Sequence, residues 1–333
     1  MRRLCCVLAL CFVATWLFAA ESEHVILGKP VGGYSVNHLG YSCGYRAKLG
    51  CSAWVAYHLK SEYFEQDRVL KGGQQLYSDP AITASGLNAP GPDDLKESSL
   101  IPLFFLPHDS ALGRGQACEK EVYSLANVAA ARESETLFKV WRELDAAIRQ
   151  WAQDYKEVWV IAGPIFAEDP ERTASRKMAI PSEYYKIVVR KDGDTIKTVA
   201  FRIPQDASGN ISQHLASIVD IEKQTDLEFF PDLPRDQRKA IKSVAQPMWE
   251  LAATKGGAPV KNKGSAAMGG SGPAKGGAQG SDAGKSAAAA GGDGKVWVIG
   301  DKFYKAGSKE YGKGNGTTMD YEAATQLGFV PGN

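Results

Sequence analysis

Apolar side chains recur at intervals of three and four residues near the middle of the chain. The residues with this spacing are Leu137, Trp141, Leu144, Ile148 and Trp151. Such spacing places them on one face of a helix. Ser134, just before the run, is a favourable N-cap residue. The pattern therefore predicts one long amphipathic helix that begins beside Ser134.

Two strands are predicted on either side of this helix. Val158–Ile161 is an uninterrupted apolar run that stops at Gly163-Pro164, as expected for a central strand covered on both faces. On the other side, the residues from Glu121 onward are predicted to form a short strand followed by a loop.

The second half of the main domain is predicted to contain a β-hairpin and two further helices. The β-rich runs Tyr184–Arg190 and Ile196–Ile203 are separated by the turn-forming residues Lys191–Asp194, which is typical of a hairpin. The helices are predicted at Ile211–Val219 and at Arg235–Leu251.

Composition divides the chain into four parts. Of its 333 residues, 44% are apolar, which is enough to bury a large core. Arg2-Arg3 is followed by seventeen residues without a charge, up to Ala20, a pattern typical of a secretory signal. We interpret residues 1–20 as a signal peptide, 21–251 as the main domain, 252–294 as a disordered Gly/Ala/Ser/Lys linker and 295–333 as a small module with a strand at Val296–Ile299 and a helix at Tyr321–Leu327.

The predicted signal implies that the mature protein is secreted or lies in the periplasm or cell envelope. Cleavage after Ala20 would place Phe18 at a position where a small residue is preferred. An uncleaved N-terminal anchor therefore stays open as the alternative. No other membrane segment is predicted.

Three cysteines lie beyond the predicted signal: Cys43, Cys51 and Cys118. The first two flank a candidate hairpin turn at Tyr45–Gly50, and an oxidising compartment favours a disulfide between them. Two reduced, half-buried thiols are the alternative. Three cysteines without a Cys-x-x-Cys motif do not make a zinc site.

Charge gives little support to a nucleic-acid partner. Residues 21–254 carry 27 basic and 32 acidic side chains. Proteins that bind the phosphate backbone usually present a basic surface. Nucleic acid is therefore a partner that the charge balance of the main domain does not favour.

Asp145 and Arg149 lie one helical turn apart, next to Trp141. By spacing alone they are an ordinary i,i+4 ion pair. The order of motifs around them, however, resembles the DNA/RNA non-specific endonucleases, ββα-metal nucleases that cut both nucleic acids. In that family a strand ending in Ser-Asn precedes a Trp-containing helix with Glu and Arg, and a strand ending in Gly-Pro-(Ile/Leu)-Phe follows. The matching residues here are Leu125-Ala126-Asn127, Trp141, Asp145, Arg149 and Ala162–Phe166.

The resemblance extends over roughly residues 35–235. Further matching stretches are Gly40-Tyr41 with Trp54–Leu59, Ile180–Val188 and Val219–Pro231. The resemblance implies an α+β fold of the ββα-metal nuclease type, with a mixed, mostly antiparallel sheet flanked by helices. The small C-terminal module would be added to this fold.

The family's chemistry resides in an Asp-Arg-Gly-His motif followed by Leu/Met-Ala-Pro. The resemblance implies that its His is the general base, that its Arg holds phosphate and that a nearby Asn binds a single Mg²⁺. Three registers align this motif with the chain, and they place the His at Gly91 (motif Asn88–Gly91), at Phe104 or at Gln116. The Phe104 register best fits the downstream spacing to Asn127. No register supplies a His.

The metal ligand of the family is missing as well. The expected Asn falls at Glu135–Leu137, and the helical Glu is shortened to Asp145. Asn127 and Arg149 match the family, and His108 stands near the motif as a candidate substitute base. Loss of a general base alone costs about 10²–10⁴-fold in rate.

We therefore expect a secreted member of this family whose catalysis is impaired and whose fold acts as a binding scaffold. The candidate site residues are Asp145, Arg149, Asn127 and His108, with Asp145 as the best metal-ligand candidate. Two alternatives stay open. The chain is an active Mg²⁺-dependent endonuclease that uses a substitute base, or it is a structural module of the cell envelope.

Overall fold

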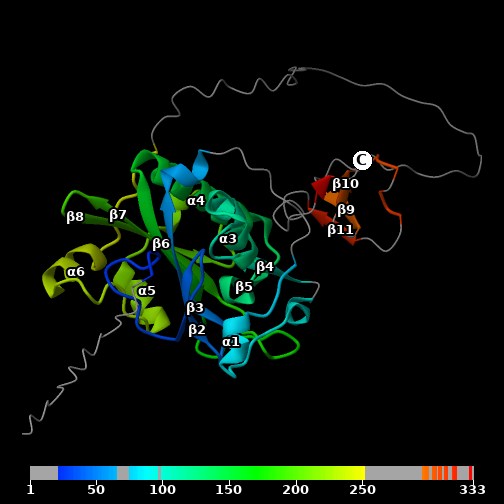
Figure 1. The fold of residues 1–333 in the computed structure, drawn as a ribbon, viewed down its shortest axis with the longest axis horizontal. Coiled ribbons are helices and arrows are strands. Elements are labelled where there is room, and N and C mark those ends of the chain that lie inside the picture. Colours follow the sequence, from blue (N-terminus) through cyan, green and yellow to red (C-terminus); the bar gives the residue numbers. More distant parts are fainter. Residues whose placement is uncertain are drawn as a thin grey trace, which may run out of the picture.

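A six-stranded antiparallel sheet forms the centre of the main domain, in the strand order β1-β2-β3-β6-β7-β8 (Figure 1). The computed structural model describes residues 22–65, 75–96 and 99–251, with parts of 295–331. The predicted signal and linker lie outside the described residues. The strands of the sheet are β1 (Tyr34–Asn37), β2 (Ser42–Arg46), β3 (Cys51–Lys60), β6 (Glu157–Ile165), β7 (Glu183–Asp192) and β8 (Thr195–Pro204).

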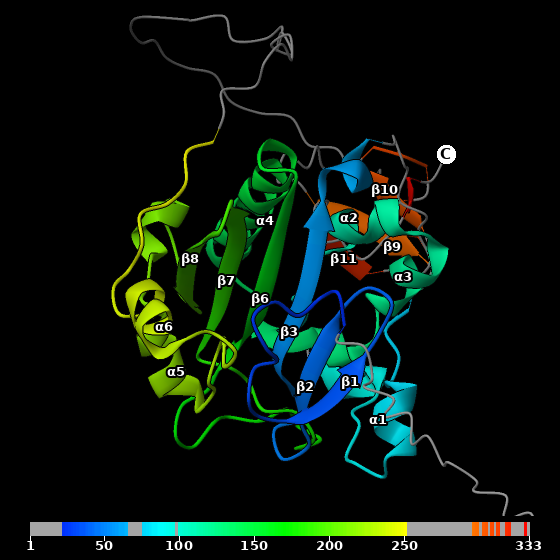
Figure 2. The same ribbon diagram turned by 60° about the vertical axis from the view of Figure 1, so that its left-hand side comes forward.

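The long helix α4 (Glu135–Asp154) covers one face of this sheet, and α5 (Ile218–Thr225) and α6 (Arg235–Lys242) cover the other (Figure 2). The Ser134 hydroxyl accepts a hydrogen bond from the amide of Leu137 at 3.3 Å, so the predicted N-cap is confirmed. The predicted central strand and hairpin are confirmed as β6 and as β7–β8.

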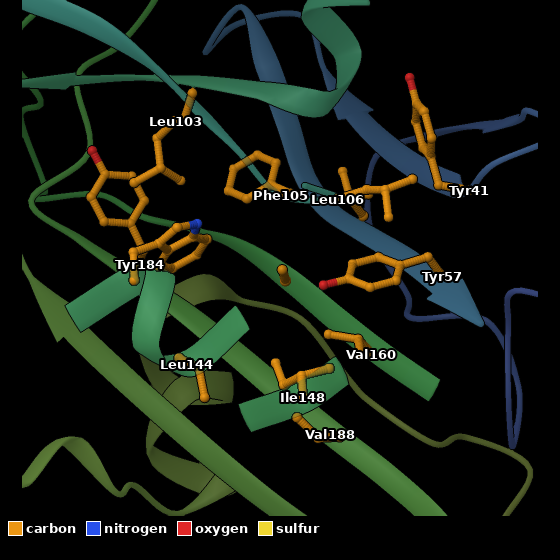
Figure 3. Packing of buried hydrophobic residues seen from close by; sticks show 14 of the residues in the cluster. Tyr41, Tyr57, Leu103, Phe105, Leu106, Leu144, Ile148, Val160, Tyr184 and Val188 are labelled. Atoms are coloured by element: carbon orange, nitrogen blue, oxygen red, sulfur yellow. The ribbon is translucent and has the colours of Figure 1, made fainter. Parts of the chain in front are cut away.

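Strand β7 contributes side chains to the hydrophobic clusters on both faces of the sheet. Successive side chains of a strand point to opposite sides. Tyr184 and Val188 therefore join the core cluster that contains α4, while Tyr185 and Ile187 join the cluster beneath α5. Figure 3 shows Tyr184 and Val188 packed with Leu144 and Ile148 of α4. The sheet is thus buried on both faces.

A two-stranded ribbon of β4 (Leu100–Phe104) and β5 (Val128–Arg132) completes the α4 side. Short helical segments connect it to the sheet. They are η1 (Ser61–Phe64), α1 (Pro80–Ala84), η2 (Pro92–Leu95), α2 (His108–Ala111), η3 (Leu112–Arg114), α3 (Gln116–Glu121) and η4 (Leu125–Asn127).

Three local predictions were wrong. Glu121 is the last residue of helix α3 and does not begin a strand. The turn η4 follows, capped by the Ser124 hydroxyl, and strand β5 therefore begins only at Val128. The predicted helix from Ile211 is a short turn, η5 (Ile211–His214), and α5 starts afresh at its own N-cap, Ser217.

The predicted helix over Arg235–Leu251 ends at Lys242, the last residue of α6. The following residues are extended or bent as far as Leu251. Trp249 packs edge-on against Trp151 and Tyr155 at the end of α4, with ring centroids 5.2 and 5.8 Å apart. Trp249, which was predicted to lie in a helix, therefore packs against the end of α4 from a non-helical segment.

The predicted disulfide between Cys43 and Cys51 is wrong, since both thiols are free and buried. Cys43 pairs with Val55 across the β2–β3 ladder, whereas Cys51 pairs with Arg46. Cys43 is thus opposite a residue four positions beyond Cys51, about 13 Å along the strand at ~3.3 Å per residue. That separation is far beyond the reach of a disulfide. Burial raises the pKa of each thiol to about 12.

The described part of the C-terminal module is a four-stranded sheet in the order β11-β9-β10-β12. Its strands are β9 (Lys295–Ile299), β10 (Lys302–Lys305), β11 (Thr317–Asp320) and β12 (Val330–Pro331). The predicted strand at Val296–Ile299 is confirmed as β9, and the predicted helix at Tyr321–Leu327 lies outside the described residues. Within the described residues, no helix combines the length and apolar character needed to cross a membrane.

Candidate functional site

Asp145, the residue that stands for the family's helical Glu, lies inside the core. It projects from the middle of α4 and accepts a hydrogen bond from the Lys186 ammonium group of β7. Only 5% of Asp145 is exposed, and Lys186 is fully buried. The Lys186 nitrogen also lies 4.0 Å from the centre of the Trp141 ring, a cation–π contact. The Asp145 carboxylate is therefore enclosed by protein and forms an ion pair with Lys186.

Burial pushes this pair toward its neutral form. Desolvation raises the pKa of Asp145, and the ammonium of Lys186 opposes that rise only in part. Desolvation likewise lowers the pKa of Lys186, against the attraction of the Asp145 carboxylate. Each partner is the main group that favours the other's charge. Loss of either one would leave the other alone in an apolar core.

In the Phe104 register the position of the family's base holds an apolar side chain, and so does Leu137, one of the three positions where the metal-binding Asn is expected. Phe104 ends β4, its carbonyl accepts a hydrogen bond from the Trp141 indole at 3.2 Å, and its ring packs edge-on against Tyr123. Leu137, in the first turn of α4, is fully buried. Neither side chain can transfer a proton or bind a metal ion.

Asn127 is fully buried and fully used by the backbone. Its amide oxygen accepts from the Leu106 N–H at 2.8 Å, and its NH₂ group donates to the carbonyls of Leu106 and Val122, each at 2.9 Å. These three bonds fix the chain just after β4 against the turn before β5. Asn127 thus stabilises the local backbone conformation.

Asp109 and Arg149 meet at the edge of this region, and His108 is the neighbour of Asp109 in sequence. His108 and Asp109 begin α2, and a guanidinium nitrogen of Arg149 lies 3.5 Å from the Asp109 carboxylate. The His108 ring is 5.4 Å from the Tyr123 ring, and burial lowers its pKa. The predicted Asp145–Arg149 pair is therefore replaced by two separate pairs, one buried and one at the surface.

The other two registers of the motif place their residues elsewhere. The Asn88 amide faces the carbonyls of Ala47 and Lys177, each at 3.4 Å. Gln116 is the exposed first residue of α3. The Phe104 register is the one that the Trp141 contact supports.

The residues present do not fit a Mg²⁺ site. Mg²⁺ requires oxygen ligands with access to water, but Asp145 is enclosed and already bound to Lys186. Glu133 and Glu135 are exposed at the start of α4 and do not share its environment. Among the described residues, no group of three or more His, Cys, Asp or Glu side chains is placed to hold a metal ion.

Lys186 is the member of this site that sequence reasoning missed. In the sequence it stands within the matching stretch Ile180–Val188. A single lysine within an otherwise apolar run was the available signal, because a lysine in a strand buried on both faces requires a buried acidic partner.

Known proteins resemble this chain in sequence and in fold. The family model described as DNA/RNA non-specific endonuclease matches residues 119–236. A mitochondrial nuclease EXOG of Danio rerio is 25% identical over 251 residues, covering 67% of this chain and 70% of that protein. A nuclease of Serratia marcescens is 24% identical over 265 residues, covering 73% of this chain and 96% of that protein.

A solved structure shares the fold. It is the crystal structure of the EndoG/EndoGI complex, which superposes with a TM-score of 0.56 at 20% identity and covers 63% of this chain and 91% of that chain. Together with the motif order and the family-model match, these similarities define the class. Over residues 119–236 the chain is similar to the DNA/RNA non-specific endonuclease family, and this similarity supports the family resemblance seen in the sequence. The expected α+β architecture is confirmed.

Proposed function

We propose that this protein is a secreted, catalytically impaired member of the family that uses the nuclease fold as a binding scaffold. The observation that carries this proposal is the replacement of the family's reactive groups by a closed core. Asp145 is neutralised by Lys186, and Phe104 takes the place of the general base. Hydrolysis of a phosphodiester at neutral pH needs a base and a stabilising charge, and neither Phe104 nor the paired Asp145 supplies one.

The first experiment measures cleavage of supercoiled plasmid DNA and of single-stranded RNA by the purified protein, with Mg²⁺ and with chelator. Circular dichroism verifies that the protein is folded, and the Serratia marcescens nuclease is the positive control. We expect a rate at least about 10²-fold below that control, because a missing general base alone costs that much. Metal-dependent cleavage at a comparable rate would overturn the proposal.

A working enzyme with a substitute base is the second candidate, and the placement of His108 beside Asp109 and Arg149 favours it. The His108→Ala variant tests this candidate in the same assay. Loss of cleavage in this variant, with wild-type folding retained, would assign the base to His108. Cleavage that is equal in both proteins would point to a contaminating nuclease.

Secretion and ligand binding need separate measurements. Fractionation of the native host, followed by N-terminal sequencing of the mature chain, tests the predicted signal; retention of Met1 in the cytoplasm would contradict it.

Fluorescence anisotropy with labelled single-stranded and duplex DNA at low and at moderate salt tests nucleic-acid binding. We expect weak binding that salt abolishes, because the main domain carries more acidic than basic groups.

A further inference from the structure

Lys186 and Asp145 meet in the protein interior, where Lys186 is fully buried and Asp145 is 5% exposed. The two residues are 41 positions apart in sequence and come from the middle of β7 and the middle of α4. Lys186 is fully buried and lies against Trp141. The core cluster on this face includes Tyr57, Leu144 and Tyr184 (Figure 3). A primary amine and a carboxyl group are therefore held in contact in a dry, aromatic environment.

We propose that Lys186 and Asp145 condense to an intramolecular isopeptide bond that cross-links α4 to β7. This proposal concerns the folded chain itself and does not rest on the proposed function. It would turn the non-covalent contact between α4 and β7 into a permanent amide.

The reaction balances without a cofactor. Proton transfer within the ion pair gives a neutral amine and a neutral carboxylic acid, with no change in total charge. The nitrogen lone pair of Lys186 attacks Cγ of Asp145, so that the Nζ–Cγ bond forms and one C–O bond breaks. The hydroxyl leaves with one proton from the nitrogen, as water. One N–H remains on the new amide, and nothing is oxidised or reduced.

The environment supplies the two requirements of this condensation. Burial lowers the pKa of Lys186 and raises that of Asp145, which favours the unprotonated amine and the protonated acid that react. The Arg149 charge lowers the pKa of Lys186 further. Groups held in such contact have effective concentrations on the order of 10⁵–10⁸ M, and exclusion of water protects the amide from hydrolysis.

Tyr57 is placed to move the proton. Its hydroxyl is buried without a hydrogen-bond partner in the described part of the chain, and Figure 3 shows the side chain directed into the interior of the cluster. Burial, and then the nearby Asp145 carboxylate, raise its pKa. No hydrogen bond joins this phenol to Asp145 in the structure, so a rotation of the Tyr57 side chain toward the carboxyl oxygen would be needed before it could donate a proton to the departing hydroxyl.

The chain contains a matched comparison in Lys242 and Glu222. Their charged atoms are 2.6 Å apart, but Glu222 keeps 19% of its side chain exposed and also accepts the Phe229 N–H at 2.8 Å. Water and a backbone donor stabilise that carboxylate in its charged form. We expect no amide between these two residues.

The test is tryptic peptide mapping of the natively purified full chain by mass spectrometry, after denaturation. A cross-link would protect the bond after Lys186 and join residues 143–149 to residues 178–190 in one branched peptide. We expect this branched peptide, lighter than the sum of its two chains by the mass of one water molecule. Tandem fragmentation would place the link between Asp145 and Lys186. Full recovery of linear 143–149 and 178–186 from folded protein would overturn the proposal.

Two variants separate the cross-link from chance association. Asp145→Asn presents an amide in place of the acid, and its condensation with Lys186 releases ammonia and yields the same branched peptide. Lys186→Met removes the amine, and we expect only linear peptides. A branched peptide in Lys186→Met, or an equal link between Lys242 and Glu222, would assign the wild-type signal to non-specific chemistry. If a variant does not fold, the wild-type map still decides.

Discussion

The two faces of the central sheet each bury a lysine beside a carboxylate, and the two pairs differ in what else surrounds them. On the α4 face, Lys186 and Asp145 are enclosed by Trp141 and the main core cluster. On the opposite face, Lys242 at the end of α6 meets Glu222 of α5, whose carboxylate also holds the Phe229 amide. The pair Lys242–Glu222 links α6 to α5 near the protein surface.

The difference shows how the surroundings of a buried carboxylate decide how strongly it depends on its lysine. A carboxylate that keeps water and a backbone donor tolerates the loss of its lysine, because other groups still solvate its charge. A carboxylate enclosed in apolar atoms depends on its lysine entirely. We infer that Lys186 is the residue that allows an acidic side chain to persist at position 145 on a face otherwise filled with apolar groups.

Removal of Lys186 is expected to have the largest effect. The Lys186→Ala variant leaves Asp145 buried without a counter-charge, which costs about 3–5 kcal/mol; loss of the proposed cross-link would add to this. Urea denaturation at pH 7 measures the free energy of unfolding. The double variant Lys186→Met, Asp145→Leu removes both charges and should recover most of the loss. An unchanged midpoint in Lys186→Ala would show that the α4 face does not depend on the pair.

Acid should weaken the opposite face through His24. This residue lies in the N-terminal segment whose Ile26 packs into the α5 cluster, and it is 3% exposed. Burial lowers the pKa of His24 from 6.5 to about 4, with help from the Arg114 charge. The unfolded chain therefore takes up the proton first, and stability present above pH 6.5 is lost as the pH falls toward 4. The loss reaches about 3 kcal/mol at most.

The measurement is the free energy of unfolding between pH 7 and pH 4 for the wild type and for His24→Gln. Glutamine retains an N–H donor for the Leu39 carbonyl, which the His24 ring contacts at 3.0 Å. Because carboxyl groups also lose stability in acid, the difference between the two proteins is the informative quantity. Parallel pH profiles would exclude His24 as the origin of the acid sensitivity.

Removal of Lys242 tests the other half of the comparison. We expect the Lys242→Ala variant to lose about 2 kcal/mol, the net value of one hydrogen bond between charged groups, because Glu222 retains the Phe229 amide and access to water. The same urea denaturation applies, with Lys239→Ala as an exposed control on the same helix. A loss as large as that of Lys186→Ala would remove the distinction between the two faces.

The elements with regular patterns were predictable from the sequence. The 3.6-residue spacing of Trp141 and its neighbours, the N-cap at Ser134 and the apolar run at Val158 each specify one local structure, and each was confirmed. The failures lie where tertiary contacts decide. Cys43 and Cys51 flank a turn in sequence, but the β2–β3 ladder pairs Cys51 with Arg46 and Cys43 with Val55, so the two cysteines are not opposite each other.

The sequence allowed the positions of the candidate site residues to be predicted, but not the contacts of their side chains. The motif order located Asp145, Arg149 and Asn127, but it did not indicate what each side chain contacts. Asn127 is used by backbone groups that lie 5 and 21 residues away, and Arg149 turns to Asp109 of another helix. The partner of Asp145 comes from a strand 41 residues later. Such pairings depend on the packed fold and leave no local pattern.

The smallest effect is expected at Arg149. Its pair with Asp109 spans 3.5 Å, with 26% of the Arg149 side chain and 55% of the Asp109 side chain exposed, so solvent screening limits its value to about 0–1 kcal/mol. Arg149→Ala should therefore unfold in urea within about 1 kcal/mol of the wild type, although it lies only one turn from Asp145. A larger loss would mean that Arg149 supports the buried pair directly. A loss of nucleic-acid cleavage without a loss of stability would instead assign it to phosphate binding, and the impaired-scaffold proposal would have to be abandoned.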